Sequence, residues 1–360
     1  MPEKRTIPLF QPPTSCRSGR SGQLREDVTP LPTFADIAKA LGVSKGTVSK
    51  AMNNAEDISP AMRQAIIEKA VELGYTRTPR GKALPRLAIF ICNMEYEHPA
   101  DFGYDIVMGF RKAAQPQGYQ VEVIPLTEEI QISMGYDAYM MQYNLSGALF
   151  LGLTLSDPWL RDFETCATPT VVYDNHIVRN PMVTQVGVDN IDGMKLAVSY
   201  LKSLGHTKIG YLGNALGSYV YRQRCEAYFV ALEESGIPVD RDLVGTDLKA
   251  MDCLYHHLPR LLEKGCTAIV CSHDILASNA LTFCMELGKS VPRDVSIIGF
   301  DDIPLCEFTM PPLTTIRQDR SQIGKSAFSA LFNQFQGIPL ASILLHPKLI
   351  CRSSCSPCCR

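Results

Sequence analysis

The chain has 360 residues, of which 46% are hydrophobic, so it is long enough for two or three domains and apolar enough to exclude a wholly disordered protein. No apolar run reaches the ~18 residues of a membrane span, and residues 1–22 lack the apolar stretch of a secretory signal, so a cytoplasmic protein without membrane contact is expected. The net charge of −2 combines +6 over residues 1–86 with −8 over residues 87–360, and a basic head on an acidic body predicts a polyanionic partner at one end.

The N-terminal part begins with a leader and continues into helices. Residues 1–31 hold Pro, Ser, Gly and charge with no apolar period, and are expected to form a flexible leader. Residues 32–77 instead predict three short helices. The first, TFADIAKAL, is expected to end at Gly42. Ser44 is expected to cap the second, KGTVSKAMNN, by accepting a hydrogen bond from a free backbone N–H at its start.

The third helix carries signals at both ends. Ser59 is expected to cap it, with Pro60 at the first helical position, where the missing N–H costs nothing. Gly74 is a natural left-handed stop. Four apolar residues recur at helical spacing and are expected to face the other two helices: Met62, Ile66, Ala70 and Leu73.

The first two helices have the spacing of a helix-turn-helix. Ala38 is small where the second helix must cross, Gly42 allows a positive φ in the turn, and Val48 supplies an apolar contact. An unrelated helical hairpin can meet these three constraints by chance. The exposed residues of the second helix suit the reading of base edges in the major groove, although a solvated lysine face is the plain alternative.

The segment PTFADIAKALGVSKGTVSKAMNNAEDISPAMRQAIIEKAVELGY resembles the DNA-binding domain of the LacI/GalR (lactose-repressor) family almost without gaps. The resemblance implies that Lys45, Gly46 and Lys50 occupy the base-reading positions. The family commonly has arginine at the last of these, and Lys50 lacks its planar fork, which implies weaker bidentate reading of guanine or a different operator. The resemblance also implies contacts with the DNA backbone from Thr33, Ser44, Thr47, Ser49 and Asn53.

Residues 78–86 resemble the hinge helix of the family, which folds when it docks in the minor groove. Leu84 matches the leucine that wedges open the central base step, at a cost of a few kcal/mol in unstacking. Gly81 lowers the helix propensity by about 1 kcal/mol relative to alanine, and Pro85 ends the helix directly after Leu84. A plain linker is therefore the alternative.

From residue 87 onward, continuously apolar runs such as LAIFI, GALFL, TVVY, KIGYL, AIVC and SIIGF alternate with helical stretches. Such runs are typical of parallel sheets covered on both faces, so a doubly wound α/β architecture in two subdomains is predicted. VGVDNIDGMKLAVSYLKSLGHTKIGYLGN and VPRDVSIIGFDDIPLCEFTMPPLTTIRQD continue the resemblance. They imply a periplasmic-binding-protein-like domain for ligand sensing and dimerisation over residues 87–350. Its N-subdomain is expected at about 87–204 and 317–338, and its C-subdomain at about 205–316 and 339–350.

The resemblance places three effector-binding residues in this domain: Arg224, Asp274 and Phe102. Arginine and aspartate on opposing walls suit a polyhydroxyl ligand, because each can grip pairs of hydroxyls, and an aromatic ring can cover the apolar face of a sugar. A surface helix residue, a helix cap and a core residue are the respective alternatives. Ala227 and Gly103 depart from the family pattern and leave the ligand open.

The thirteen cysteines are of two kinds. Most stand singly in apolar runs, as Cys92 and Cys271 do, where buried reduced thiols are expected. Residues 351–360 crowd four together: Cys351, Cys355, Cys358 and Cys359. Structural zinc sites usually pair two separated ligand knuckles, so this segment is interpreted as a loose, oxidation-prone tail, and neither a metal nor a cofactor is expected.

These features predict a sequence-specific DNA-binding transcription regulator that binds a palindromic operator in double-stranded DNA as a homodimer. Closure of the cleft around a small, sugar-like effector is expected to change operator affinity, with repression the expected outcome and activation left open. One alternative is a ligand-binding module whose degenerate head no longer binds DNA. The other is an enzyme with an accessory helix-turn-helix, which would need a nucleophile–base set or a complete phosphate loop. GKS at 324–326 is not such a loop, because Asp319 stands at the required first glycine, and no catalytic residue is expected.

Overall fold

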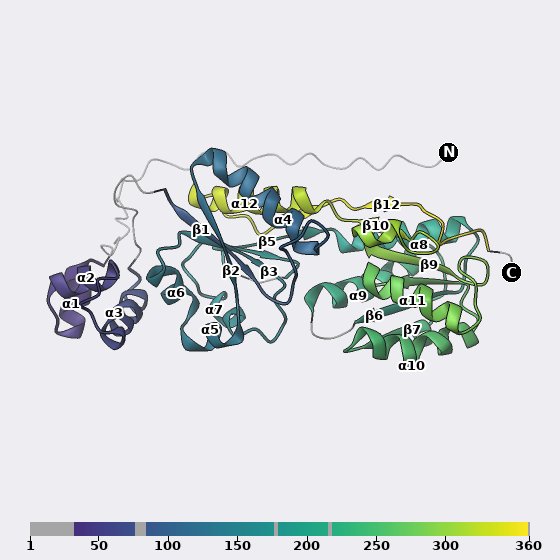
Figure 1. Ribbon diagram of the computed structural model, residues 1–360, viewed down its shortest axis with the longest axis horizontal. Helices are drawn as coiled ribbons and strands as arrows, with labels where there is room; N and C mark the ends of the chain where they lie inside the picture. Colours follow the sequence, from purple (N-terminus) through teal and green to yellow (C-terminus); the bar gives the residue numbers. More distant parts are fainter. Residues whose placement is uncertain (1–31, 76–83, 176–178, 215–217, 359–360) are drawn as a thin grey trace, which may run out of the picture.

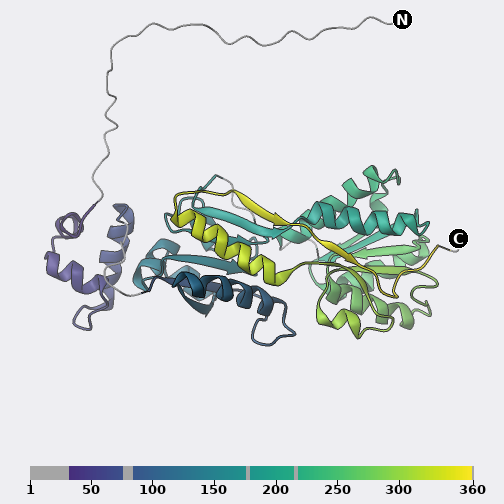
Figure 2. The same cartoon turned by 90° about the horizontal axis from the view of Figure 1, so that it is seen from above.

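The structure, a computed structural model, describes residues 32–75, 84–175, 179–214 and 218–358. A small helical head and two α/β lobes lie in a row along the long axis (Figures 1 and 2). The fold class expected from the sequence is confirmed: a helical N-terminal domain is followed by two subdomains, each with its own largely parallel sheet. The expected leader, residues 1–31, lies outside the described residues.

The head consists of three helices, α1 (Phe34–Leu41), α2 (Lys45–Met52) and α3 (Pro60–Glu72). The end signals expected from the sequence are confirmed. Gly42 has a φ of +66°, and the hydroxyls of Ser44 and Ser59 each accept a hydrogen bond from the backbone N–H three residues further on, at 3.0 and 3.3 Å. Local chemistry therefore sets the bounds of the helices in the head.

Only two of the four apolar residues of α3 that the sequence predicts to be buried are buried. Ile66 and Ala70 are buried in the head core, but Met62 and Leu73 are 38% and 37% exposed. Ile67 is buried instead, outside that core. Two parts of the molecule contact α3: α1 and α2 of the head, and α6 (Tyr136–Gln142) of the first lobe. Its buried residues therefore do not form a single stripe along the helix.

The first lobe is built on a six-stranded sheet of order β11-β5-β4-β3-β1-β2, in which every neighbouring pair is parallel. Helices α4 and α12 cover one face, and α5, α6 and α7 cover the other. The strands are β1 (Arg86–Ile91), β2 (Gln120–Pro125), β3 (Gly147–Leu151), β4 (Thr170–Tyr173), β5 (Val183–Val188) and β11 (Ser342–Leu345). The helices are α4 (Phe102–Ala114), α5 (Glu128–Ser133), α7 (Trp159–Asp162), α12 (Arg320–Phe335) and the short η1 (Gln115–Gln117).

The second lobe repeats the plan with the order β12-β10-β9-β8-β6-β7, and only the edge strand β12 runs antiparallel. Helices α8 and α9 cover one face, and α10 and α11 the other. The strands are β6 (Ile209–Asn214), β7 (Val244–Asp247), β8 (Ala268–Cys271), β9 (Ser296–Asp301), β10 (Thr314–Arg317) and β12 (Lys348–Ile350). The helices are α8 (Asn190–Ser203), α9 (Tyr219–Glu234), α10 (Ala250–Glu263), α11 (Asp274–Glu286), η2 (Arg241–Leu243) and η3 (Pro304–Glu307).

The chain passes between the lobes after β5, after β10 and after β11. The sequence predicts the first passage near residue 204, but it follows Val188, because α8 packs against α9 and the second sheet. The expected return at residue 317 agrees with β10, and α12 then covers the first sheet. Residues 339–345 are expected in the second lobe, which is wrong, because β11 pairs in parallel with β5. An amphipathic helix or a four-residue edge strand does not indicate which sheet it joins.

The C-terminal segment is not the loose tail expected from its cysteines. Ser354 is fully buried, and its hydroxyl donates to the carbonyl of Ile297 at 2.5 Å and accepts from the N–H of Thr314 at 2.8 Å. Further along, the N–H of Cys358 donates to the carbonyl of Leu204 at 2.7 Å. These hydrogen bonds hold the segment along the second lobe, and no group of metal-ligating side chains occurs among the described residues.

Candidate functional site

Helix α2 separates its apolar and polar side chains onto opposite sides. Val48, Ala51 and Met52 are buried in the head core. The opposite side carries residues at spacings of one and four, which share one face of a helix. These are Lys45, Gly46, Ser49, Lys50 and Asn53. The structure thus brings five of the predicted DNA-binding residues together on one face, and none of these five residues is acidic.

The remaining predicted contacts of the head have local partners. Thr33 caps α1, and its hydroxyl donates to the carboxylate of Asp36 at 2.7 Å. The hydroxyls of Ser44 and Thr47 are 2.8 Å apart at the start of α2. These groups hold the N-termini of the two helices, where backbone N–H groups favour anions. Their contact with DNA stays a prediction.

Two residues of the face show features that the fold alone does not require. A Cβ at Gly46 would meet only the Ser44 hydroxyl, at 3.4 Å, so no crowding demands glycine there, although glycine in a helix costs about 1 kcal/mol. Close approach of another molecule to the helix backbone would explain why glycine stands at position 46. Lys50 forms an exposed ion pair with Asp57, in the loop between α2 and α3.

The predicted hinge lies mostly outside the described residues. Leu84 is half-exposed, and its side chain approaches Gly118 of the first lobe. Arg86, which the sequence assigns to the hinge, is instead the first residue of β1, where its Nε donates to Glu122 at 2.9 Å. The body of the protein therefore begins at residue 86, and the wedge role of Leu84 stays a prediction.

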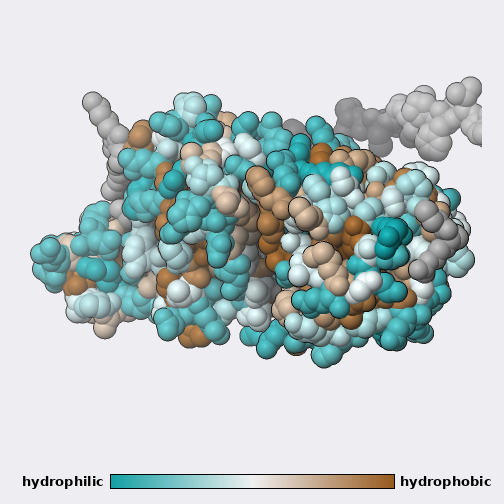
Figure 3. All heavy atoms as spheres, turned by 45° about the vertical axis from the view of Figure 1, so that its right-hand side comes forward, coloured by the Kyte–Doolittle hydropathy of each residue, from teal (hydrophilic) through white to brown (hydrophobic). Residues whose placement is uncertain are grey.

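A cavity of about 560 Å³ lies between the two lobes and is lined by residues of both. The lining comes from the segments at and after the C-terminal ends of β1, β3 and β4 in the first lobe and of β6, β8, β9 and β10 in the second. Open α/β sheets bind ligands at this edge. Figure 3 shows apolar surface where the lobes meet and on the second lobe.

Arg224 is the centre of the polar network in this cleft. It is only 1% exposed, with its guanidinium 3.7 Å from the centre of the Phe300 ring. Its Nε donates to Asn190 at 2.9 Å, and its Nη1 donates to the carbonyl of Ser272 at 2.6 Å and to Asp301 at 3.1 Å. The prediction that Arg224 lies at a ligand cleft is consistent with this position.

The structure does not bring Asp274 into the cleft. Asp274 is 1% exposed and does not line the cavity. Its carboxylate accepts from the hydroxyl of Thr315 at 2.6 Å and from the N–H of Ile303 at 3.0 Å. Burial, together with the nearby Asp301, raises the pKa of Asp274 to about 7. Its contacts are those of an internal structural group.

The acid that faces Arg224 is Asp301, which the sequence analysis missed. It ends β9, lines the cavity, and also accepts from Gln318 at 2.6 Å. Burial raises its pKa, and the charge of Arg224 opposes that shift. A signal was present, since Asp301 directly follows the apolar run SIIGF and so lies at the ligand-binding edge of a parallel sheet.

Two further residues complete the cleft. His273 caps α11 through Nδ1, which accepts from the N–H of Leu276 at 3.2 Å, and burial beside Arg224 lowers its pKa to about 4. Phe102, at the start of α4, lines the cavity as predicted, with its ring centre 6.3 Å from that of Tyr173. The cleft therefore combines aromatic rings with buried polar groups.

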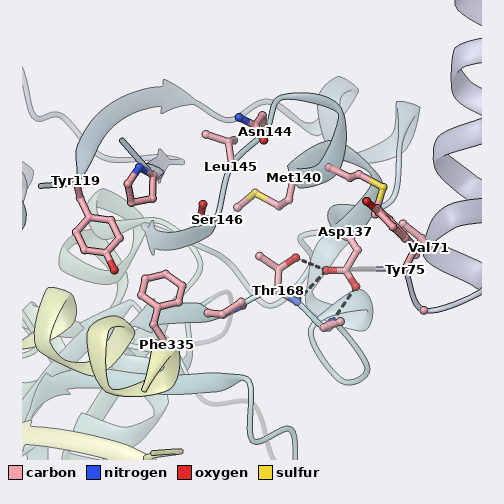
Figure 4. A pocket seen from close by; sticks show the side chains of 15 residues that line it. Val71, Tyr75, Tyr119, Asp137, Met140, Asn144, Leu145, Ser146, Thr168 and Phe335 are labelled. Carbon is pink, nitrogen blue, oxygen red and sulfur yellow. Dashed lines mark hydrogen bonds between the residues drawn. The ribbon is translucent and has the colours of Figure 1, made fainter. Parts of the chain in front are cut away.

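A second cavity, of about 410 Å³, lies between the head and the first lobe (Figure 4). Its walls include Val71 and Tyr75 of the head and Met140 of α6. The carboxylate of Asp137 accepts from both the N–H and the hydroxyl of Thr168, at 3.1 and 2.5 Å. Because its charged group is satisfied within the lobe, this cavity offers a ligand fewer convergent polar groups than the cleft between the lobes.

Comparisons with known proteins match both parts of the chain. Residues 33–78 match the family model of bacterial regulatory proteins, lacI family, and residues 198–355 match a periplasmic binding protein-like domain. The HTH-type transcriptional repressor CytR of Escherichia coli (strain K12) is 31% identical over 330 residues, 89% of this chain and 96% of that protein. The HTH-type transcriptional regulator MalR of Streptomyces coelicolor is 28% identical over 89% and 96% of the two chains.

Solved structures give the same picture. The complex of the transcriptional regulator CelR with cellobiose has a TM-score of 0.66 and 26% identity, covering 90% of this chain and 99% of that one. The lac repressor dimer bound to operator and the anti-inducer ONPF, at 24% identity and a TM-score of 0.62 over 91% and 99%, shares the fold. The curated relatives are transcription regulators, which favours a regulator over an enzyme. Within the described part of the chain, no helix is long and apolar enough to cross a membrane.

Proposed function

Because the chain belongs to the lacI family of bacterial regulatory proteins and is a DNA-binding transcription regulator, we propose that it represses transcription from a palindromic operator as a homodimer. A small, carbohydrate-like effector binds between its lobes and controls operator affinity. The structural neighbours bound to cellobiose and to operator support this pairing of ligands. Because its proposed operator is DNA, we expect the protein to act in the cytoplasm.

The buried pair of Arg224 and Asp301 is the observation that carries the effector half of this proposal. Both residues line a cavity that Phe102 and Asp174 of the other lobe also line. A ligand that bonds to both walls favours the closed arrangement of the lobes. Because the chain passes between the lobes at three places, closure moves the first lobe and the head attached to it, and coupling between two such sites is typically worth about 1–3 kcal/mol.

Exposed apolar residues of the second lobe support the homodimer. Phe308 and Met310 are 80% and 84% exposed, and Leu248, Met251 and Tyr255 are also exposed along α10 and the turn before it. We propose that these residues contribute to the contact between two copies of the chain, because contiguous exposed apolar surface marks protein–protein contact sites. A two-fold axis would then present two α2 helices to successive half-sites of a near-palindrome.

The DNA half is tested by a gel shift of the full chain against a library of palindromes centred on CG. We expect sequence-selective binding whose affinity falls steeply with salt, because lysine–phosphate contacts release counterions. Equal affinity for every palindrome and for random duplex would contradict the proposal and support the alternative of a degenerate head.

The effector half is tested with two aspartate variants. A compound that alters operator binding by the wild-type chain should lose its effect in Asp301→Asn, because Asp301 lines the cavity. It should keep its effect in Asp274→Asn, because the Asp274 carboxylate bonds within the lobe. The reverse pattern would restore the effector role that the sequence predicts for Asp274.

A further inference from the structure

We infer that the head docks directly on the first lobe through α3 and α6, and that this contact passes movement of the lobe to α2. The inference rests on the proposed function, because it names how the lobes regulate the binding of α2 to an operator. In Figure 1, α3 lies beside α6, and the two helices are in contact. The supporting observations are a second buried face on α3, two contacts from α6 to the head, and the position of β3.

Helix α3 has a buried face that the head core does not use. Ile66 and Ala70 are buried in that core, whereas Ile67 is 1% exposed without belonging to it. Ile67 and Val71 are four residues apart and so share one side of the helix. Val71 lines the cavity between the head and the first lobe (Figure 4). The position of Ile67 therefore indicates that α3 packs against a second surface, on the first lobe.

Helix α6 presents one apolar side chain to the head and keeps the others in its own lobe. Tyr136, Tyr139 and Met140 belong to the core of the first lobe. Met141 instead packs against the head core, and every other described residue that packs there belongs to the head itself. Methionine suits such a contact, because its flexible thioether fills irregular gaps. Met141 is therefore the apolar anchor of the docked head.

A hydrogen bond joins the end of α2 to the same helix. The Nδ2 of Asn54 donates to the carbonyl of Gln142 at 3.2 Å. Asn54 directly follows Asn53, the C-terminal cap of α2, and has a φ of +55°, which asparagine adopts more readily than most residues. Met141 and Gln142 are adjacent, so one short stretch of α6 holds both the head core and the end of α2.

The contact leaves the proposed DNA-facing side of α2 open. Lys45, Gly46 and Lys50 are exposed in the docked head, so docking orients α2 without covering it. The cavity of about 410 Å³ remains between the docked surfaces, whereas a native core holds few voids larger than a water molecule. The head can therefore leave the lobe without unfolding either part.

Strand β3 joins this contact to the cleft between the lobes. Leu145 and Ser146, just before β3, line the cavity beside the head, and Gly152 and Leu153, just after it, line the cleft. All five residues of β3 are buried inside a parallel sheet. The two sites therefore lie at opposite ends of one rigid element, and rotation of the first lobe carries α6 and the docked head with it.

The sequence between the head and β1 makes a direct contact more important. Gly81 and Pro85 both disfavour a continuous helix between the two parts. Segments of low helix propensity transmit orientation poorly, because they do not fix the direction of one end relative to the other. The contact between α3 and α6 therefore supplies the orientation of α2.

The test measures how strongly DNA binding by the full chain depends on the spacing of the two half-sites. The probes are the palindrome bound best in the library and the same palindrome with one or two base pairs added at its centre. The wild-type chain should bind the lengthened probes about 100-fold more weakly, because two oriented modules engage together only when the geometry fits. In Met141→Gln, which adds no charge, this penalty should shrink by about tenfold. Affinity for a duplex with a single half-site should not change.

Two further variants control this result. Ile132→Gln makes the same kind of change at a residue of α5 that is 69% exposed and lines neither cavity, and it should keep the wild-type penalty. Asn54→Gly tolerates the positive φ without strain and removes the bond to Gln142, so it should also reduce the penalty. If Met141→Gln does not fold, Asn54→Gly decides the question.

Hydrogen exchange of the DNA-free chain measures docking itself. Peptides from α3 should exchange about fivefold faster in Met141→Gln than in the wild type, because the variant loses an apolar contact that stabilises the head. Peptides from α8, in the second lobe, should keep the wild-type rates and serve as the internal reference. Ile132→Gln should leave both sets of peptides unaltered.

The outcomes separate the contact from the proposed function. Wild-type spacing penalties in both Met141→Gln and Asn54→Gly would overturn the transmission through α6, and wild-type exchange of α3 in Met141→Gln would overturn the docking; the regulator itself would stand in either case. Absence of sequence-selective binding by the wild-type chain would instead contradict the DNA half of the proposed function. Faster exchange of α3 in Met141→Gln would then still support the docked head, and unchanged exchange would overturn it.

Discussion

The head and the cleft use their polar side chains in opposite ways. On the head, Ser44 and Lys50 are exposed and bond to partners within seven residues of the chain. In the cleft, Arg224 is buried and bonds to groups 34, 48 and 77 residues away. Residues that would meet DNA can therefore change with little effect on folding. Residues that would meet the effector are also part of the folded core, so recognition and stability are coupled there.

Arg224→Ala should have the largest effect on stability. It leaves Asp301 buried without its cation, and breaking a buried ion pair typically costs about 3–5 kcal/mol. Chemical unfolding of the full chain measures this loss. The control is Arg222→Ala, which alters an exposed arginine of the same helix and should change the free energy of unfolding little. Equal stability of the two variants would show that the pair is not part of the core.

The pH dependence of His273 comes next. Its folded pKa of about 4 lies below the unfolded value of 6.5, so between these values the unfolded chain binds a proton that the folded chain does not. Stability therefore falls as the pH falls from 6.5 to 4, by about 3 kcal/mol for this group, and levels off below pH 4.

His273→Gln should remove that part of the pH dependence. The free energy of unfolding is measured for wild type and variant across pH 4 to 8, and the difference between the two curves is the informative quantity. His346→Gln, which alters a residue with a 91% exposed side chain, is the control and should keep the wild-type slope. A constant difference between wild type and His273→Gln would contradict the buried, neutral histidine.

The contrast between local bonds in the head and distant bonds in the cleft also explains which features could be predicted from the sequence. The helix bounds of the head follow from Gly42, Ser44 and Ser59, whose partners are a few residues away, and the strands of the body follow from their continuous apolar runs. Asp274 and Asp301 could not be told apart in this way. Both follow apolar strands, and only the packing of distant β10 gives Asp274 the hydroxyl of Thr315 and leaves Asp301 in the cleft.

The ordered C-terminal segment could not be predicted for the same reason. Its cysteines suggest chemistry, but Ser354 fixes it, through bonds to Ile297 and Thr314 some 40 or more residues away. No local pattern marks a serine as the residue that will be buried. Non-local hydrogen bonds thus limit sequence analysis both in the cleft and at this edge of the second lobe.

Lys50→Ala on the head should change DNA binding and leave folding almost unaltered. If Lys50 reads a base edge, its loss costs about 1–3 kcal/mol in operator affinity and relaxes specificity at one base pair per half-site. Selection from the palindrome library measures both effects. Lys39→Ala, an exposed lysine of α1, is the control and should weaken binding slightly and equally on all sequences. Uniform weakening by Lys50→Ala would mean that Lys50 contacts only phosphate.

Asp57→Asn should have the smallest effect, and whether it raises or lowers the affinity for DNA is the informative result. Asp57 holds Lys50 in an exposed ion pair, and such pairs contribute little to stability, so the unfolding midpoint should not move. The variant frees the ammonium of Lys50 and removes a negative charge beside the DNA-facing side of α2. The affinity for DNA should therefore rise on every sequence. The slope of log affinity against log salt concentration should steepen by up to the amount expected for about one additional phosphate contact.

Glu56→Gln is the matched control, since it neutralises the neighbouring exposed acid, for which no bond to Lys50 is found in the described structure. It should raise affinity less than Asp57→Asn does. Weaker and less selective operator binding by Asp57→Asn would give Asp57 a different role, because the ion pair would then orient Lys50 toward its base. In that case the polar groups of the head would be held in position before DNA binds, as those of the cleft are held before the effector binds. The head and the cleft would then differ only in how deeply these groups are buried.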